Sequence, residues 1–235
     1  MALILTIETS SDSCSVALSR NGELYATMQS DEDRSHAHIL TVLIEKLLAQ
    51  NSITIADLDA VAVSKGPGSY TGLRIGVSVA KGICYGARKP LLAVNTLRAM
   101  MAGLQTETTD FATQFSDNAV FCPMLDARRQ EVYLAMFSKD GHLLKETTAE
   151  IINSESFADI LANREMIFFG SGAGKVKDII KNPKATFVEH FGLKASYLSS
   201  LAEAAWQNKR FEDVAYFEPL YLKDFVATTA KRKVI

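Results

Sequence analysis

The sequence contains few of the features that mark secreted, metal-binding or membrane proteins. Its three cysteines, Cys14, Cys84 and Cys122, are isolated and odd in number, and none belongs to a CxxC pair. This usage indicates a reducing compartment and argues against a disulfide framework or a cysteine–zinc site. No hydrophobic run approaches the length of a membrane span, and an acid, Glu8, follows the start without a basic region. We therefore expect no signal peptide, no membrane segment and a cytoplasmic location.

Positive charge is scarce as well. The formal net charge of the 235 residues is −2 at pH 7, so the chain has no general basic field that would hold nucleic acid by phosphate contacts alone. If RNA is involved, we expect a partner protein to supply the groove. The length suits one compact unit or two small lobes.

The most informative stretch joins a short apolar strand, residues 58–63, to a helix with few charges. Gly66-Pro67-Gly68 breaks the strand, and the helix is predicted to begin near Ser69 or Thr71 and to run to about Tyr85. Glycine inside a helix costs about 1 kcal/mol relative to alanine. The small residues on this helix therefore need a compensating close approach of another backbone.

Those small residues, Gly72, Gly76 and Ala80, lie one turn apart on one face. One explanation is tight packing within the core of the same chain. The other is that this face receives a helix from another chain, with the core side held by Leu73, Ile75, Val79 and Ile83.

A second helix is predicted over residues 35–50, with Ser35 as its cap and a core stripe of Leu40, Leu43, Ile44, Leu47 and Leu48. Ile39 and Val42 widen its apolar arc, which favours a second buried surface. We therefore predict that the two helices form a partner interface. Its predicted residues are Leu40, Leu43, Leu47, Tyr70, Gly72, Leu73, Gly76 and Ala80.

One layout of strands and turns occurs twice. A strand at residues 3–7 leads to Glu8 and then to a hairpin turn at Asn21-Gly22, and a strand at 120–125 leads to Asp126 and then to a turn at Asp140-Gly141. The acid precedes the turn glycine by 14 residues in the first copy and by 15 in the second. This repeat predicts two related lobes, 1–108 with the partner-binding helices and a smaller 109–235, with a C-terminal tail that packs back.

An acid and small hydroxyl residues after a strand can face a phosphate or its metal ion, whereas the alternative is an ordinary solvated turn. The glycine turn at 170–174 also joins a strand to a helix, but Phe169 and Val176 stand where a P-loop needs glycine and Ser or Thr. A tight strand-to-helix connection is the alternative there. The candidate nucleotide-proximal residues are Glu8, Thr9, Ser10, Gly170 and Gly172.

Farther along, Ser196 is a candidate cap for a helix through Trp206, and the chain closes on a basic run, Lys231-Arg232-Lys233. We find no nucleophile with a recognisable base, so no catalytic residue and no metal site are predicted.

Four stretches together resemble the TsaB (YeaZ) family: residues 7–10, 65–76, 126–133 and 219–222. The resemblance implies the two-lobed α/β fold of the actin, hexokinase and heat-shock ATPase (ASKHA) superfamily, with a mixed sheet and flanking helices in each lobe. It also implies a non-catalytic role in making N6-threonylcarbamoyladenosine (t6A) at position 37 of tRNA.

The catalytic relative, TsaD, carries a His-x-x-x-His pair for its metal, and the resemblance places Thr96 and Met100 at those positions. Neither side chain replaces imidazole as a ligand there. The resemblance therefore implies a pseudoenzyme that binds TsaD as a heterodimer, associates with the ATPase TsaE, forms a homodimer when alone and meets tRNA through the complex. It implies no tightly bound cofactor, with ATP or ADP as candidate ligands at the complex interface. The alternatives are a stand-alone ASKHA-type ATPase or kinase that uses Glu8, and a metallopeptidase.

Overall fold

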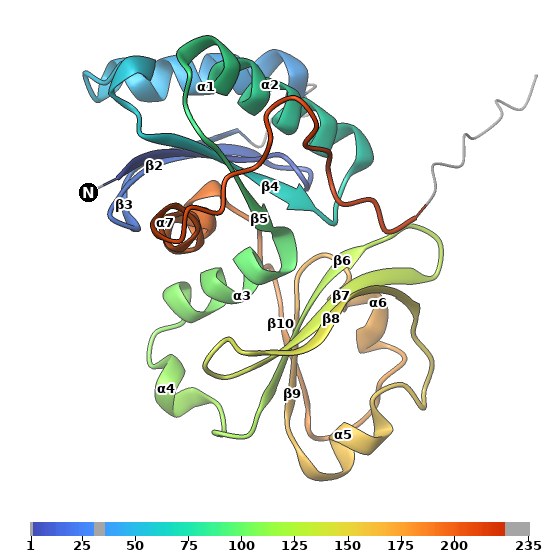
Figure 1. Cartoon of the computed structure of the whole chain (residues 1–235). Helices are drawn as coiled ribbons and strands as arrows, with labels where there is room; N and C mark the ends of the chain where they lie inside the picture. The colour runs from blue at the N-terminus through green and yellow to red at the C-terminus, as the bar shows by residue number, and fades with distance from the viewer. Residues whose placement is uncertain (1, 31–35, 224–235) are drawn as a thin grey trace, which may run out of the picture.

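Two five-stranded mixed sheets form the framework of the molecule, one in each lobe (Figure 1). The computed structural model describes residues 2–30 and 36–223 of the chain. Within those residues no helix combines the length and the apolar character needed to cross a membrane.

The first sheet has the strand order β3-β2-β1-β4-β5. Its β1, β2 and β3 form an antiparallel meander, while β4 and β5 add in parallel to β1. The turn between β2 and β3 is the predicted one, with positive φ at both Asn21 and Gly22. The elements of this part of the chain are β1 Leu3–Glu8, β2 Cys14–Arg20, β3 Glu23–Ser30, α1 His36–Gln50, η1 Ile55–Asp57, β4 Ala60–Gly66, α2 Tyr70–Ala87, β5 Leu91–Asn95 and α3 Thr96–Glu107.

The second sheet has the order β8-β7-β6-β9-β10, which repeats the order of the first sheet strand for strand. Its β6, β7 and β8 form the antiparallel meander, and β9 and β10 add in parallel. The duplicated layout predicted from the acid and glycine spacing is therefore present. Its elements are α4 Phe111–Gln114, β6 Val120–Asp126, β7 Glu131–Ser138, β8 Leu143–Ile151, α5 Ala158–Asn163, β9 Met166–Phe169, α6 Ala173–Lys177 and β10 Ala185–Val188.

Successive side chains of β1 point to opposite faces of the first sheet, and this explains how both faces are covered. Leu3, Leu5 and Ile7 point into the core beneath α1 and α2, while Ile4 points to the opposite face. That opposite face is covered by the last helix, α7 Ser199–Gln207, and by the 3-10 turn η2 Ala195–Leu198 before it. Figure 1 shows α1 and α2 on one side of this sheet and α7 on the other.

The C-terminal part of the chain returns to the first lobe. After α7, Glu212 donates its backbone N–H to the Leu91 carbonyl at 2.9 Å, and Leu220 donates its N–H to the Lys65 carbonyl at 2.7 Å. Between these points the Lys81 ammonium on α2 donates to the carbonyls of Ala215 and Phe217. Residues 208–223 therefore run across α2 and the loop before it, as the red segment in Figure 1 shows.

The structure differs from the sequence-based prediction at the start of the last described helix. Ser196 was expected to cap the last helix, but it lies inside η2, and the residue before the first turn of α7 is Leu198. A 3-10 turn leading directly into the helix makes the side-chain cap unnecessary.

The predicted cap Ser35 and the basic run 231–233 lie outside the described residues. The division at 108/109 stays a prediction, and α3, which precedes it, packs on β6 and β7 of the second sheet.

Candidate functional site

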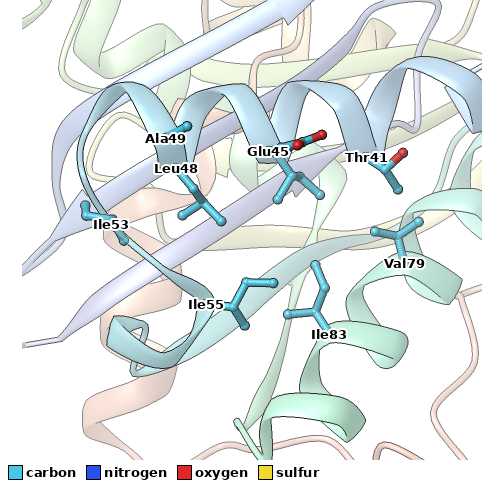
Figure 2. A pocket seen from close by; sticks show the side chains of 9 residues that line it. Thr41, Glu45, Leu48, Ala49, Ile53, Ile55, Val79 and Ile83 are labelled. Carbon is cyan, nitrogen blue, oxygen red and sulfur yellow. The ribbon is translucent and has the colours of Figure 1, made fainter.

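An apolar groove lies between α1 and α2 on the surface of the first lobe. It has a volume of about 370 Å³ and is lined mostly by aliphatic side chains from α1, α2, η1 and the segment between α1 and η1. Figure 2 shows Leu48, Ile55 and Ile83 pointing toward one another across this groove, with Val79 beside them. A second hollow of about 580 Å³ shares Ile55 and Ile83 and continues along α2 past Gly82 and Gly86 to Lys89. The two hollows together form one strip, which we call the α1–α2 groove.

The small residues predicted to face a partner point inward instead. A Cβ on Gly72 would lie 2.0 Å from the Thr9 carbonyl oxygen, and a Cβ on Gly76 would lie 2.3 Å from Thr9 Oγ1. Ala80 is fully buried in the core below α2. Close packing within the same chain is therefore the explanation that the structure supports, and the predicted surface position of these three residues is wrong.

Four leucines of the predicted interface are also buried within the chain, so they cannot form its outer surface. They are Leu40, Leu43, Leu47 and Leu73. Tyr70 is half-buried, and its ring lies 4.9 Å from that of Tyr221, measured between centroids. Val79 and Ile83, which were assigned to the core side of α2, instead line the open groove while packing partly on the core.

The exposed face of α2 carries its own small residues. A Cβ on Gly82 or on Gly86 would meet no atom within 4 Å. Between them Tyr85 is 83% exposed, although it is a large aromatic residue. Sequence reasoning missed this face, although Ser78, Gly82 and Gly86 have the same four-residue spacing as the inner set. The signal was present, and it could have been found by extending the small-residue pattern along the whole helix.

The end of β1 forms a buried polar cluster beneath the start of α2. Glu8 is fully buried, and its Oε1 accepts the Ser10 N–H at 2.5 Å. Removal from water raises the pKa of Glu8, and the nearby Ser10 and Ser64 hydroxyls lower it by less. Thr9 donates its hydroxyl to the Gly72 carbonyl at 2.8 Å. These contacts tie the loop after β1 to the first turn of α2.

The glycine turn of the second lobe packs directly on β6. A Cβ on Gly170 would lie 2.4 Å from the Met124 carbonyl oxygen, and a Cβ on Gly172 would lie 3.0 Å from the Leu125 carbonyl carbon. The structure therefore gives both glycines a packing role, as the tight-connection alternative expected. The other three candidates do not share these contacts with β6. They lie beside the loop before α2 and the start of that helix, and they are Glu8, Thr9 and Ser10. A nucleotide contact by any of these five residues stays a prediction.

Thr96 and Met100 lie one turn apart at the start of α3, facing the interior. Thr96 is fully buried and its hydroxyl lies 2.9 Å from that of Ser64, while Met100 is 1% exposed within the core of the second lobe. In the part of the chain that the structure describes, no group of three or more His, Cys, Asp or Glu side chains is placed to hold a metal ion. The two positions therefore serve packing and a hydroxyl–hydroxyl contact.

The duplicated strand order is that of the ASKHA fold, as predicted. A solved structure of an activator of 2-hydroxyisocaproyl-CoA dehydratase from Clostridium difficile, with bound ADPNP, shares this fold with a TM-score of 0.50 at 10% identity. The likeness covers 88% of this chain and 97% of that one.

Closer similarities cover almost the whole chain. The family model described as "TsaD: tRNA N6-adenosine threonylcarbamoyltransferase" matches residues 30–231. The tRNA threonylcarbamoyladenosine biosynthesis protein TsaB of Escherichia coli K12 is 28% identical over 230 residues, which covers 95% of this chain and 96% of that protein. The structure of YeaZ from Pseudomonas aeruginosa gives a TM-score of 0.77 at 27% identity and covers 94% of this chain and 100% of that one. The chain therefore belongs to the TsaB (YeaZ) family, which is related to TsaD.

Proposed function

We propose that this chain is a non-catalytic subunit in tRNA threonylcarbamoyladenosine biosynthesis and that it binds TsaD through the α1–α2 groove. The biosynthetic role follows from the names of its relatives. The observation that carries the binding role is the open apolar groove itself, whose second hollow is lined by the uncovered glycines Gly82 and Gly86.

A pair of helices is the occupant that suits this surface. Gly82 and Gly86 leave the α2 backbone uncovered, so another helix can approach it closely. The exposed Tyr85 ring offers a large amphipathic contact of the kind that is enriched at interfaces. Because the TsaD family model matches the residues that form α1 and α2 of this chain, we expect TsaD to have an equivalent helix pair. Two similar helix pairs can then meet about a pseudo-twofold axis.

The interior of α3 supports a non-catalytic role. Thr96 makes its contact with Ser64, and Met100 fills the core against the glycine turn, where its Cε would lie 2.2 Å from a Cβ on Gly170. Both side chains have packing functions at the positions where the family resemblance places the metal-binding histidines of TsaD. Threonylcarbamoyl transfer is then the task of TsaD.

The remaining parts of the proposal concern the assembly. TsaE joins the pair of this chain and TsaD, and tRNA is met through the complex. In the absence of TsaD, two copies of this chain pair through the same groove. ATP or ADP is a candidate ligand at the interface of the complex with TsaD. The cytoplasm is the expected site of the reaction.

The test is size-exclusion chromatography with mass determination of this chain mixed with TsaD from the same organism. The wild-type chain should give a one-to-one complex at micromolar concentration. Gly82→Leu should fold normally, because nothing lies within 4 Å of the new Cβ, but its side chain should hold the partner helix away and abolish the complex. Gly174→Leu is the matched control, because Gly174 is equally uncovered and lies on α6 of the other lobe.

Each outcome bears on a different part of the proposal. Separate peaks for the wild-type chain and TsaD at micromolar concentration would contradict direct binding. A normal complex with Gly82→Leu would contradict the α1–α2 groove as the binding surface. Loss of the complex with Gly174→Leu as well would show that the effect of Gly82→Leu is not specific to the α1–α2 groove.

A further inference from the structure

The turn between β6 and β7 holds two consecutive arginines in an unusual backbone conformation. Arg128 has φ 64° and Arg129 has φ 54°, so both residues occupy the left-handed region. Outside glycine this conformation costs about 1–2 kcal/mol for each residue. Two adjacent residues of this kind persist only where the surroundings fix the backbone.

Two lysines from distant parts of the chain fix this turn. Lys175 on α6 donates to the Arg129 carbonyl at 2.8 Å and pairs with the Asp126 carboxylate. Lys223, at the end of the C-terminal segment, donates to the Ala127 carbonyl at 3.3 Å and pairs with Glu131. Figure 1 shows the end of this segment beside the β6–β7 turn. The backbone conformation is therefore held from both sides.

The acidic groups near the turn are already paired. Asp126 accepts from Lys175 and from the Arg128 backbone N–H, and Glu131 pairs with Lys223. On the adjacent strand β8, Glu150 pairs with Lys145. Arg128 and Arg129 are both exposed, and no ion pair joins either guanidinium to another of the described residues. The turn thus has an excess of two positive charges, since it holds two carboxylates, those of Asp126 and Glu131, and four cations, those of Arg128, Arg129, Lys175 and Lys223.

We propose that this turn contacts the RNA backbone and that Arg128 and Arg129 bind its phosphate oxygens, an inference that rests on the proposed role in tRNA modification. Guanidinium groups bind phosphate through paired hydrogen bonds and lose little hydration on doing so. A turn fixed in advance presents them without a further ordering step. The net charge of the chain is −2, so this local excess adds phosphate contacts to those of the partner and does not replace them.

The test is the affinity of the complex of this chain with TsaD for an unmodified tRNA transcript, measured by fluorescence anisotropy between 50 and 200 mM salt. The variant is Arg128→Gln/Arg129→Gln. The matched control is Lys209→Gln/Arg210→Gln, which removes two adjacent exposed cations, one of them also left-handed with φ 52° at Lys209. The salt slope is the slope of the logarithm of the affinity against the logarithm of the salt concentration, and each phosphate contact contributes about 0.7–0.9 to it. Two contacts therefore make the wild-type affinity fall about tenfold more than that of the variant between 50 and 200 mM salt.

The result that supports the proposal is a reduced salt slope in the Arg128/Arg129 variant and a wild-type slope in the control. Equal slopes in all three proteins would overturn it, and so would equal reductions in both variants, which would show a general charge effect. Chromatography of each variant with TsaD shows whether the variant still forms the complex, so a loss of phosphate contacts can be distinguished from a failure of the proposed binding to TsaD. If the wild-type chain formed no complex, the same titrations on the chain alone would decide the question by the same comparison of slopes.

Discussion

Alanine substitutions at two glycines of α2 should have opposite effects on stability. In Gly76→Ala the new Cβ would lie 2.3 Å from Thr9 Oγ1, and Thr9 is 1% exposed, so its side chain has no free space to enter. Overpacking of this kind costs about 1–3 kcal/mol. Displacing the Thr9 hydroxyl also breaks its hydrogen bond to the Gly72 carbonyl, which adds about 0.5–1.5 kcal/mol.

The helix propensity of alanine offsets part of this loss. Alanine is favoured over glycine in a helix by about 1 kcal/mol, so Gly76→Ala should lower the free energy of unfolding by about 0.5–3.5 kcal/mol after all of these effects. At Gly82 only the gain in helix propensity applies, because nothing lies within 4 Å of the added Cβ. Gly82→Ala should therefore raise the free energy of unfolding by about 0.5–1 kcal/mol.

Thermal unfolding followed by circular dichroism measures both effects. For a chain of this size 1 kcal/mol corresponds to about 2–4 °C in Tm. The double variant Thr9→Ala/Gly76→Ala tests the cause, because removal of Oγ1 should recover part of the loss that Gly76→Ala alone produces. A Gly76→Ala protein as stable as the wild type, or a double variant with simply additive losses, would refute the packing argument.

Three further predictions concern buried groups and the C-terminal segment. Because burial raises the pKa of Glu8 above 4.5, its contribution to stability is full below that pH and is lost as the pH rises through the folded-state value. The Glu8→Gln chain should therefore gain stability relative to the wild type as the pH rises above 4.5 in urea titrations, and a constant difference would contradict this assignment. The three cysteine thiols are buried with raised pKa values, so a thiol reagent at neutral pH should label none in the native chain and all three after denaturation. Lys81→Met should speed chymotrypsin cleavage within residues 208–223, because it removes two hydrogen bonds that hold this segment. The control, Lys89→Met, should leave the cleavage rate unchanged, because Lys89 donates to the Ala56 carbonyl and not to this segment.

Most strands, the first hairpin and the duplication could be predicted from the sequence because local signals determine them. Asn21-Gly22 is a strong hairpin signal, and the apolar stretches that became β1 and β4 are buried on both faces, as parallel neighbours require. The repeat of an acid followed by a turn glycine revealed the duplication. These features depend on residues close together in the chain.

Two strands, β8 and β10, escaped prediction because their own sequences show no strand pattern with a buried face. No residue of β8 is fully buried, and charged and threonine residues occupy much of its length, so it shows no buried face. β10 has only four residues, none of them fully buried. Their pairing with β7 and β9 comes from the neighbouring strand and not from a strong pattern of their own.

The orientation of α2 could not be read from its sequence. Two sets of small residues share the same spacing along the helix, one at Gly72 and Gly76 and the other at Gly82 and Gly86. Which set faces inward depends on Thr9, about sixty residues earlier in the chain, because its carbonyl and hydroxyl occupy the space next to the first set. Contacts between distant segments decide this, and no local pattern encodes them.

The return of the C-terminal part to the first lobe has a consequence for synthesis on the ribosome. One apolar face of the first sheet, including Ile4 and Leu92, is completed by Ala202 and Ala205 of α7. While the chain is being translated, that face remains uncovered until α7 has left the exit tunnel, long after the sheet itself is available. We therefore expect the nascent first lobe to bind chaperones that shield apolar surfaces, and a chain truncated before α7 should aggregate after release.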